Sequence, residues 1–336
     1  MTRIGRVAAC AGLAPALALA EAPLQYVRTA GPAADPVTAL GWGLAAISGV
    51  VLAGVCITLL LGLARRRARV PVHELAVPSD RGGLAWIYVG VGITAVVLTA
   101  CTVWTVLTIR AIAMPVHAAD VTLEVTAAQW WWRVRYRDAD ATSPFMAANE
   151  LHIPVGRPVR IDLASEDVIH SFWIPQLAGK MDAIPGRTNV LWLQADKPGV
   201  YRGQCGEFCG AEHARMAMVV VADAPNDYAA WRAHQLLPAP APAADDHVQA
   251  GAVAFTSHCG ACHTVRGTQA GGLLGPDLTH LMSRKAIAAG ILPNTRGNLA
   301  AWVSDPQAIK PGSRMPAPRL SPTELQDVLA YLRTLD

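Results

Sequence analysis

The sequence predicts a multidomain membrane protein, with a hairpin of two transmembrane helices before an all-β domain and a smaller second soluble domain. Three observations support this prediction. Hydrophobic residues make up 52% of the 336 residues and charged residues only 16%, which indicates membrane content. Two apolar stretches are long enough to cross a bilayer, and a Pro/Ala tract divides the chain that follows them. The net charge of +3 is small and no basic tract of the kind that binds nucleic acid is present, so we expect no nucleic-acid partner.

Residues 1–20 are typical of a secretory signal peptide. Arg3 and Arg6 precede an apolar run that ends in Ala18-Leu19-Ala20, an A-x-A cleavage motif. An uncleaved membrane anchor is the alternative. In either case the chain is directed to a membrane or across it.

Residues 38–110 predict a transmembrane hairpin, with helices over about 38–63 and 84–109. Neither stretch contains a charged residue. Four arginines follow the first stretch: Arg65, Arg66, Arg67 and Arg69. The positive-inside rule places this loop in the cytoplasm, and therefore everything after Arg110 on the outer side. A buried hairpin of a soluble protein is the alternative, and the length of both spans argues against it.

Residues 118–231 show a different pattern, with short segments rich in β-branched and aromatic residues. VTLEVTAAQWWWRVRY and ELHIPVGRPVRIDLAS alternate in part between apolar and polar residues, and Gly and Pro turns separate such segments. This pattern predicts an all-β sandwich or barrel. Such a scaffold can hold ligand loops rigidly at one end.

The stretch GQCGEFCGAEHARM, from Gly203 to Met216, concentrates candidate metal ligands. It contains Cys205, Cys209, His213 and Met216. Sulfur and imidazole donors suit copper, and His170 in SEDVIHSFWIP is a candidate for a further ligand. A blue-copper site needs one Cys, so the second thiolate indicates a bridged pair of copper ions. The alternatives are a disulfide or a zinc site, neither of which explains Met216 or His170.

These motifs resemble the copper A domain of cytochrome c oxidase subunit II. SEDVIHSFWIP, KMDAIPGR and PGVYRGQCGEFCGAEHARM follow that family's order and spacing, and the resemblance covers roughly residues 35–231. It implies a cupredoxin-like Greek-key barrel in which Cys205 and Cys209 bridge two copper ions. The implied terminal ligands are His170, His213, Met216 and the backbone carbonyl of Glu207. The Glu207 side chain is implied to reach a magnesium ion at the boundary with subunit I.

Three consecutive tryptophans, Trp130 to Trp132, lie on a predicted strand, where alternate side chains point to opposite faces. The resemblance implies that Trp130 is exposed near the copper ions and is the residue through which electrons enter. Ordinary packing is the alternative, and we favour it for Trp131. Alternating arginines follow, where the family usually has acidic or neutral residues: Arg133, Arg135 and Arg137. If they flank Trp130, attraction to a basic soluble cytochrome is weakened.

Residues 232–246 include the Pro/Ala tract LLPAPAPAADD, which predicts a semi-rigid linker. Residues 247–336 then form a second predicted domain. Its motif Cys259-Gly260-Ala261-Cys262-His263 is typical of c-type haem attachment, in which both thiols bind the haem covalently and the His ligates the iron. Redox and zinc sites can carry the same spacing of cysteines.

The remainder of this domain resembles a class I cytochrome c, a small all-α fold. The resemblance rests on the haem motif, on GPDL from Gly275, on GSRMP from Gly312 and on a closing amphipathic helix from Ser321. It implies Met315 as the distal iron ligand, with Met282 as the competing candidate. We expect His258 and His280 on the surface, and Trp302 in the core.

Together the two resemblances imply the electron-input subunit of a caa-type cytochrome c oxidase. Its cofactors would be haem c, dinuclear copper A and a magnesium ion. Electrons would pass from external cytochrome c or a cytochrome bc complex to haem a of subunit I, supporting oxygen reduction and proton pumping, with subunit III as a further partner. We expect a multi-pass protein of the bacterial inner membrane, with both soluble domains on the periplasmic side. The alternatives are the copper A subunit of a nitric oxide reductase and a membrane-anchored electron carrier.

Overall fold

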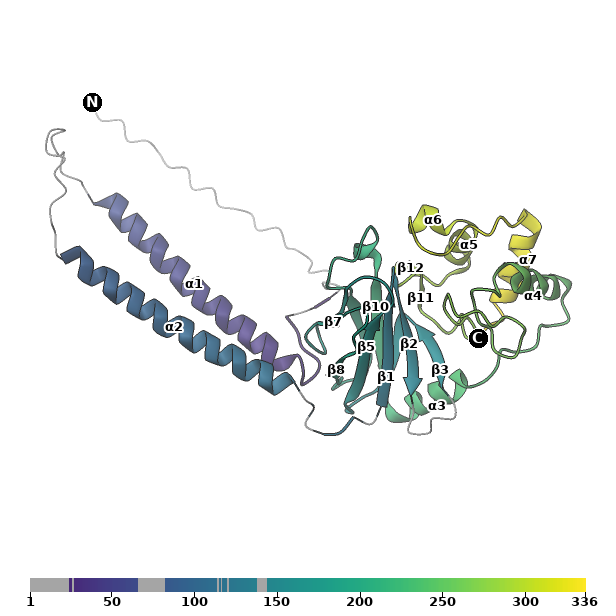
Figure 1. Cartoon of the computed structure of the whole chain (residues 1–336), viewed down its shortest axis with the longest axis horizontal. Coiled ribbons are helices and arrows are strands. Elements are labelled where there is room, and N and C mark those ends of the chain that lie inside the picture. The colour runs from purple at the N-terminus through teal and green to yellow at the C-terminus, as the bar shows by residue number, and fades with distance from the viewer. Residues whose placement is uncertain are drawn as a thin grey trace, which may run out of the picture.

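The computed structural model describes residues 24–25, 27–65, 82–113, 115, 117–119, 121–137 and 144–336. The predicted signal peptide and most of the arginine-rich loop lie outside these residues. The described chain is elongated, with two long helices at one end, a β domain in the middle and a small helical domain at the other end (Figure 1).

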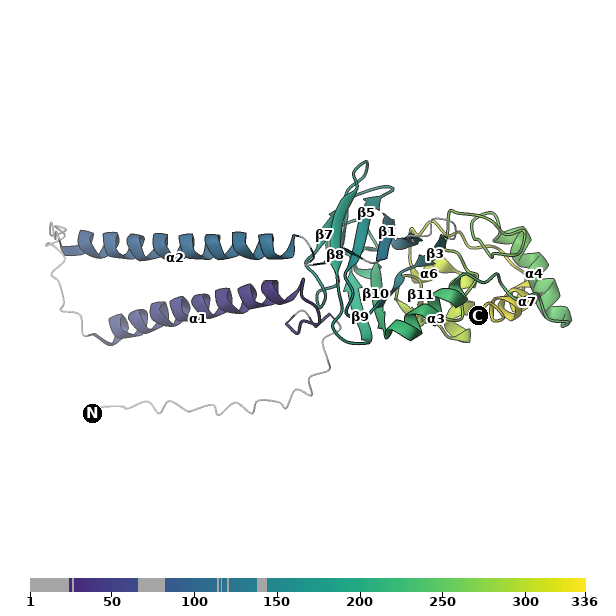
Figure 2. The same cartoon turned by 90° about the horizontal axis from the view of Figure 1, so that it is seen from below.

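The two long helices, α1 (Asp35–Ala64) and α2 (Gly82–Ile112), run side by side away from the β domain (Figures 1 and 2). Asp35 and a proline in the first turn suit the start of α1, where a carboxylate and a missing N–H are both favourable. Both helices are long and apolar enough to cross a membrane, and their most apolar windows are 0% buried. Apolar side chains exposed all along a helix indicate an apolar surrounding. Both predicted spans are helical, as expected.

Both helices are bonded to the β domain where they meet it. The chain just before α1 lies on the domain surface: Ala30 N donates to Gln176 O at 2.8 Å, and Asp196 N donates to Ala30 O at 2.8 Å. At the end of α2, Trp192 Nε1 donates to Ile112 O at 2.8 Å. The hairpin is thus attached to the β domain at two separate points.

The β domain packs a five-stranded sheet, in the order β3-β2-β1-β5-β8, against a three-stranded sheet, in the order β4-β10-β9. β1 pairs with β2, β2 with β3, and β9 with β10 as consecutive antiparallel strands, whereas β1 pairs in parallel with β5, and β4 with β10, where the chain crosses between the sheets. The strands are β1 (Val121–Ala128), β2 (Trp131–Arg137), β3 (Phe145–Ala148), β4 (Glu150–Pro154), β5 (Val159–Ser165), β6 (His170–Phe172), β7 (Met181–Ala183), β8 (Asn189–Leu193), β9 (Gly199–Gln204) and β10 (Ala217–Asp223).

Period-two patterning explains the core of the β domain. On β2, Trp132, Val134 and Tyr136 are buried, while the residues between them face outward. They meet Leu123 and Val125, which alternate in the same way on β1. The predicted all-β, cupredoxin-like domain is confirmed.

The helical domain packs α4 (Asp246–His258) against α7 (Pro322–Leu332). A Cβ on Gly251 of α4 would lie 1.9 Å from Asp327 O, so only glycine permits this approach. A capping box between Ser321 and Glu324 starts α7, as the predicted closing helix requires. The remaining elements are β11 (Ala286–Ile287), β12 (Leu292–Pro293), α5 (Arg296–Ser304) and α6 (Pro306–Ile309).

The predicted linker differs from an extended spacer. The helix α3 (Pro225–Gln235) includes its first four residues, 232–235. The next residues lie on the helical domain, where Ala239 N donates to Arg266 O at 2.9 Å and His280 Nε2 lies 3.1 Å from Leu237 O. This contact buries His280 to 3% exposure, so the prediction of a surface histidine was wrong.

Candidate metal centre and haem cavity

Two segments bring the predicted metal ligands to one end of the β domain. His170 opens β6, and the stretch from Cys205 to Met216 connects β9 to β10. The ends of this loop are closed on each other, because Cys205 N donates to Met216 O at 2.9 Å. Gly206 N donates to Ser171 O at 2.9 Å and fixes the loop beside β6. We call residues 205–216 the metal loop.

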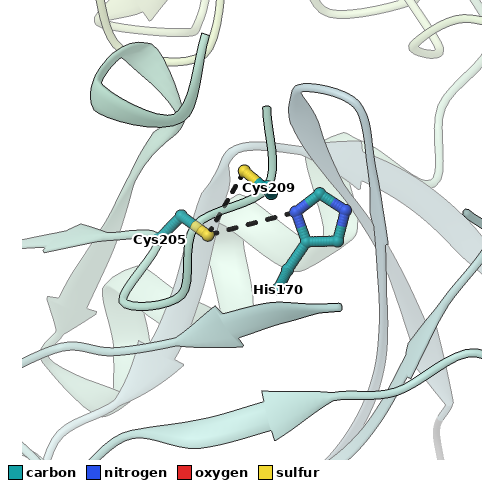
Figure 3. A group of neighbouring side chains, drawn as sticks. All are labelled: His170, Cys205 and Cys209. Atoms are coloured by element: carbon teal, nitrogen blue, oxygen red, sulfur yellow. Dashed lines mark hydrogen bonds between the residues drawn. The ribbon is translucent and has the colours of Figure 1, made fainter. Parts of the chain in front are cut away.

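The side chains of His170, Cys205 and Cys209 are buried and point toward one another (Figure 3). The two sulfurs lie 3.8 Å apart, and Cys205 Sγ lies 4.0 Å from His170 Nδ1. Two thiols and an imidazole nitrogen at such distances can enclose soft or borderline metal ions.

The remaining predicted donors surround the same pair of sulfurs. Cys209 Sγ lies 3.6 Å from His213 Nδ1 and 3.9 Å from Met216 Sδ. Cys205 Sγ lies 3.2 Å from Glu207 O. The structure therefore brings together three sulfurs, two imidazole nitrogens and one carbonyl oxygen, each imidazole presenting Nδ1 to a thiol.

Asp167 fixes the ring of His170. Asp167 Oδ1 lies 2.8 Å from His170 Nε2, so a proton on Nε2 leaves Nδ1 free to ligate. Burial alone would raise the pKa of Asp167, but hydrogen bonds from His170 and from the amides of Gln129 and Val168 outweigh it and lower the pKa. Sequence reasoning missed this residue, although its position three residues before His170 is a usable signal.

The two thiols differ strongly in pKa. The hydrogen bond with Cys209 lowers the pKa of Cys205 to about 3 and raises that of Cys209, so one sulfur ionises first. Thiolates are the form that binds metal, and a bound cation favours ionisation of the second sulfur as well. The donor set and its burial therefore fit a pair of copper ions.

The Glu207 side chain points away from the donors. Its carboxylate is 45% exposed, with Lys180 Nζ at 3.4 Å from Oε2. The neighbouring Phe208 is 76% exposed, so an acidic and an apolar side chain stand together on the outer face of the metal loop.

Trp130 lies beside the metal loop, but it is not exposed. Its Nε1 donates to Cys209 O at 2.9 Å, and its exposed fraction is 8%. The prediction of an exposed Trp130 was wrong because the helical domain covers it. Trp131 is half-buried under the guanidinium of Arg133, 5.1 Å from the ring centroid.

The three alternating arginines are paired with acids. Arg135 and Arg137 both bind Glu124, at 3.2 and 2.8 Å. Arg133 pairs with Glu166, and it also donates to Leu273 O of the helical domain at 3.2 Å. Arg133 therefore bonds to both domains, and Arg135 lines a pocket between them together with Arg133.

A cavity of about 550 Å³ lies between the helical domain and the β domain. It is lined by the four predicted haem residues, Cys259, Cys262, His263 and Met315. Trp302 and His258 also line it, whereas Met282 packs in the core of the helical domain.

His263 is held for ligation through Nε2. Its Nδ1 lies 2.9 Å from Pro276 O, which leaves the other nitrogen free. A Cβ on Gly275 would lie 2.6 Å from His263 Cε1, so this position has no room for a side chain. The paired thiols, the oriented imidazole and the thioether around one apolar cavity fit a covalently bound haem.

Comparisons with known proteins match both soluble domains. Residues 142–223 match the family described as cytochrome c oxidase subunit II, periplasmic domain, and residues 248–336 match cytochrome c. The chain is 40% identical over 216 residues to cytochrome c oxidase subunit 2 of Alkalihalophilus pseudofirmus, covering 64% of this chain and 61% of the relative. It is 32% identical over 227 residues to cytochrome c oxidase subunit 2 of a Bacillus species, covering 64% and 62%.

The chain thus spans about three fifths of the length of these curated relatives. Among solved structures, the periplasmic domain of subunit II of cytochrome oxidase of Bradyrhizobium japonicum is 33% identical, with a TM-score of 0.34. That match covers 36% of this chain and 96% of the solved one.

Proposed function

We propose that the chain is the electron-input subunit of a haem–copper cytochrome c oxidase, because residues 142–223 match the periplasmic domain of cytochrome c oxidase subunit II and residues 248–336 match cytochrome c. In this role it passes electrons from cytochrome c or a cytochrome bc complex, by way of haem c and copper A, to haem a of subunit I. It thereby supports oxygen reduction to water and proton pumping.

The observation that carries this proposal is the converged set of six donor atoms at the metal loop. Cys205 and Cys209 would bridge two copper ions, with four terminal donors from His170, His213, Met216 and the carbonyl of Glu207. When bound, the copper pair supplies a site that gains and loses one electron at a time. The protein buries both sulfurs and fixes His170 through Asp167, which excludes water and limits movement of the ligands.

The haem cavity supports the second half of the proposal. Cys259 and Cys262 would bind the haem covalently, and His263 and Met315 would ligate its iron. When bound, a haem with Met and His ligands supplies a one-electron site of raised potential. Pro276 O and Gly275 hold the His263 ring in place for this role.

The proposed partners follow from the surface of the metal loop and from the helices. Exposed Glu207 and Phe208 support docking onto subunit I, with a magnesium ion at Glu207 and with subunit III in the same complex. The two apolar helices support a multi-pass protein of the bacterial inner membrane, with both soluble domains on the periplasmic side.

The test is optical and electron paramagnetic resonance spectroscopy of the purified complex. We expect a mixed-valence copper pair and a low-spin haem c. In Cys209→Ser the copper signal and cytochrome oxidation should be lost while haem c remains reducible, because one bridging sulfur is gone.

Cys56→Ser is the matched control, because Cys56 is exposed on α1 and far along the chain from the metal loop. It should keep both signals. Zinc alone at the site, or normal turnover in Cys209→Ser, would contradict the proposal.

A further inference from the structure

The helical domain is fastened to the β domain by a buried lysine. Lys310 follows α6 and is 3% exposed. Its Nζ donates to Trp130 O at 2.5 Å and to Arg215 O at 2.8 Å, both in the β domain. Arg215 in turn donates to Ile309 O at 2.8 Å, so the two domains exchange hydrogen bonds at this point.

A buried ammonium is costly unless acceptors surround it. Burial lowers the pKa of Lys310 to about 8, and the nearby Glu212 carboxylate, itself buried, acts in the opposite direction. The two carbonyls come from the segment before β2 and from the metal loop, which are far apart in sequence. Lys310 therefore joins both to the helical domain at once.

The same contact encloses Trp130. Gly210 of the metal loop and Gly312 of the helical domain both have positive φ, +115° and +80°. A Cβ at Gly210 would lie 3.1 Å from Trp130 Cζ2, and one at Gly312 would lie 3.4 Å from Cη2. Backbone from each domain thus lies against the six-membered ring, where most side chains would be strained or crowded.

Two neighbouring acids beside the metal centre, Glu166 and Asp167, form ion pairs with an arginine of the helical domain. Arg314 Nη2 lies 3.1 Å from Asp167 Oδ2, and Nη1 lies 3.9 Å from Glu166 Oε2. Arg314 directly precedes Met315, and Asp167 holds His170, so one ion pair connects the neighbourhoods of both cofactor sites. The two carboxylates that would attract a cationic partner protein to this face are therefore already paired with Arg314.

We propose that the face around Trp130 is a permanent docking surface for the chain's own cytochrome domain, and that Lys310 is the positioning residue that holds this domain there. The order of haem c before copper is already part of the proposed function, and the cover over Trp130 and the acidic pair agrees with it. The docking stands on the contacts alone, whereas the order of reduction also rests on the proposed function.

Because the linker already keeps the two domains close together, a few hydrogen bonds from Lys310 are enough to hold the helical domain in its docked position. A short linker holds an attached domain at an effective concentration on the order of millimolar. Removing Lys310 leaves two buried carbonyls without their donor, and a loss of that kind shifts an equilibrium by about tenfold or more. The open population of the native protein should rise by that factor.

Hydrogen exchange of the purified complex tests the docking without relying on either cofactor's activity. In Lys310→Met, backbone amides over 129–133 and 309–314 should exchange about tenfold faster, while those of α4 and α7 stay protected. Lys310→Arg, which retains a donor, should restore part of the protection. Lys285→Met is the control, because its side chain is exposed on the same domain.

Arg314→Gln is a second variant, because the half-exposed Arg314 side chain can be changed without a defect in folding. It should give a smaller increase in exchange at the same segments. Unchanged exchange in both Lys310→Met and Arg314→Gln, or rapid exchange at these segments in the native complex, would overturn the docking.

Stopped-flow reduction by a basic soluble cytochrome c tests the order of reduction. In the native complex haem c should be reduced before copper, and in Lys310→Met the interval between the two should lengthen as the docked population falls. The bimolecular rate of haem reduction and the haem potential should not change, which separates positioning from a damaged haem site. Copper reduction ahead of haem c in the native complex would overturn the order while leaving the docking intact.

Discussion

The two cofactor sites differ in how far the protein alone assembles them. At the metal loop, each candidate donor atom lies within 4.0 Å of the sulfur of Cys205 or Cys209, and His170, Cys205 and Cys209 are buried. Between the helical domain and the β domain, the predicted haem residues line a cavity of about 550 Å³. One site is a set of side chains in contact, whereas the other is a space that its cofactor must fill.

The difference follows from the two scaffolds. The β domain closes its own core, and Trp132 packs edge-on against both Phe172 and the candidate ligand His170. The helical domain has short helices and about 90 residues, and a chain of that size buries too little apolar surface to leave such a space empty. We infer that the β domain folds without copper, whereas the helical domain needs haem to complete its hydrophobic core.

The largest expected effect comes from preventing haem attachment with Cys259→Ala and Cys262→Ala together. A domain of this size is stable by only about 5–15 kcal/mol, so loss of the group that covers the apolar lining of the cavity should unfold it. Hydrogen exchange should therefore show α4 and α7 unprotected while the β domain keeps its protection.

Ser257→Ala is the control for this experiment, because Ser257 is an exposed residue on the same helix. Continued protection of α4 and α7 without haem would break the comparison, since it would show a core that does not need its cofactor.

A smaller effect is expected from Asp167→Asn, which removes the carboxylate behind His170. Copper affinity should fall 10- to 100-fold, the usual cost of losing such a partner, as measured by competition with a chelator. The thermal transition of the β domain should change little, because its core is independent of the metal. Glu166→Gln is the matched control, and an equal loss of affinity in it would point to general charge instead of the His170 contact.

The smallest effect is a pH dependence in the β domain, away from both cofactors. Burial alone would lower the pKa of His152, but hydrogen bonds with Asp223 at 2.6 Å and Glu150 at 3.1 Å outweigh it and raise the pKa above 6.5. A raised folded-state pKa gives stability that is complete below pH 6.5 and is lost as the pH rises through the folded value.

His152→Gln should therefore lower the Tm of the β domain by a few degrees at pH 5.5 and by less at pH 8.5. Differential scanning calorimetry of the full chain measures this change. His117→Gln, at an exposed position, is the control. A loss that grows with pH would contradict the assignment and would place the stabilising interaction in the neutral ring.

The convergence of the metal donors was predictable from sequence because most of them lie on one loop. The spacing of Cys205, Cys209, His213 and Met216 already requires them to be neighbours, and only His170 comes from elsewhere. The haem motif is local in the same way. Short-range spacing therefore carried most of both candidate sites.

Features that depend on contact between the domains could not be predicted. The burial of Trp130 arises from residues about 180 positions later in the chain, and Lys310 stands in no motif. His280 is buried by a segment whose composition predicts a spacer. In each case the deciding contact joins segments that carry no complementary pattern in the sequence.

The double attachment of the hairpin to the β domain has a mechanical consequence. A domain held at one point can rotate about that point. The hydrogen bonds at Ala30 and at Ile112 hold the β domain at two points and restrict this rotation. Any tilt or vertical shift of the paired helices is then transmitted to the barrel as a rigid-body movement. The two attachment points therefore set the height of the metal loop above the lipid surface.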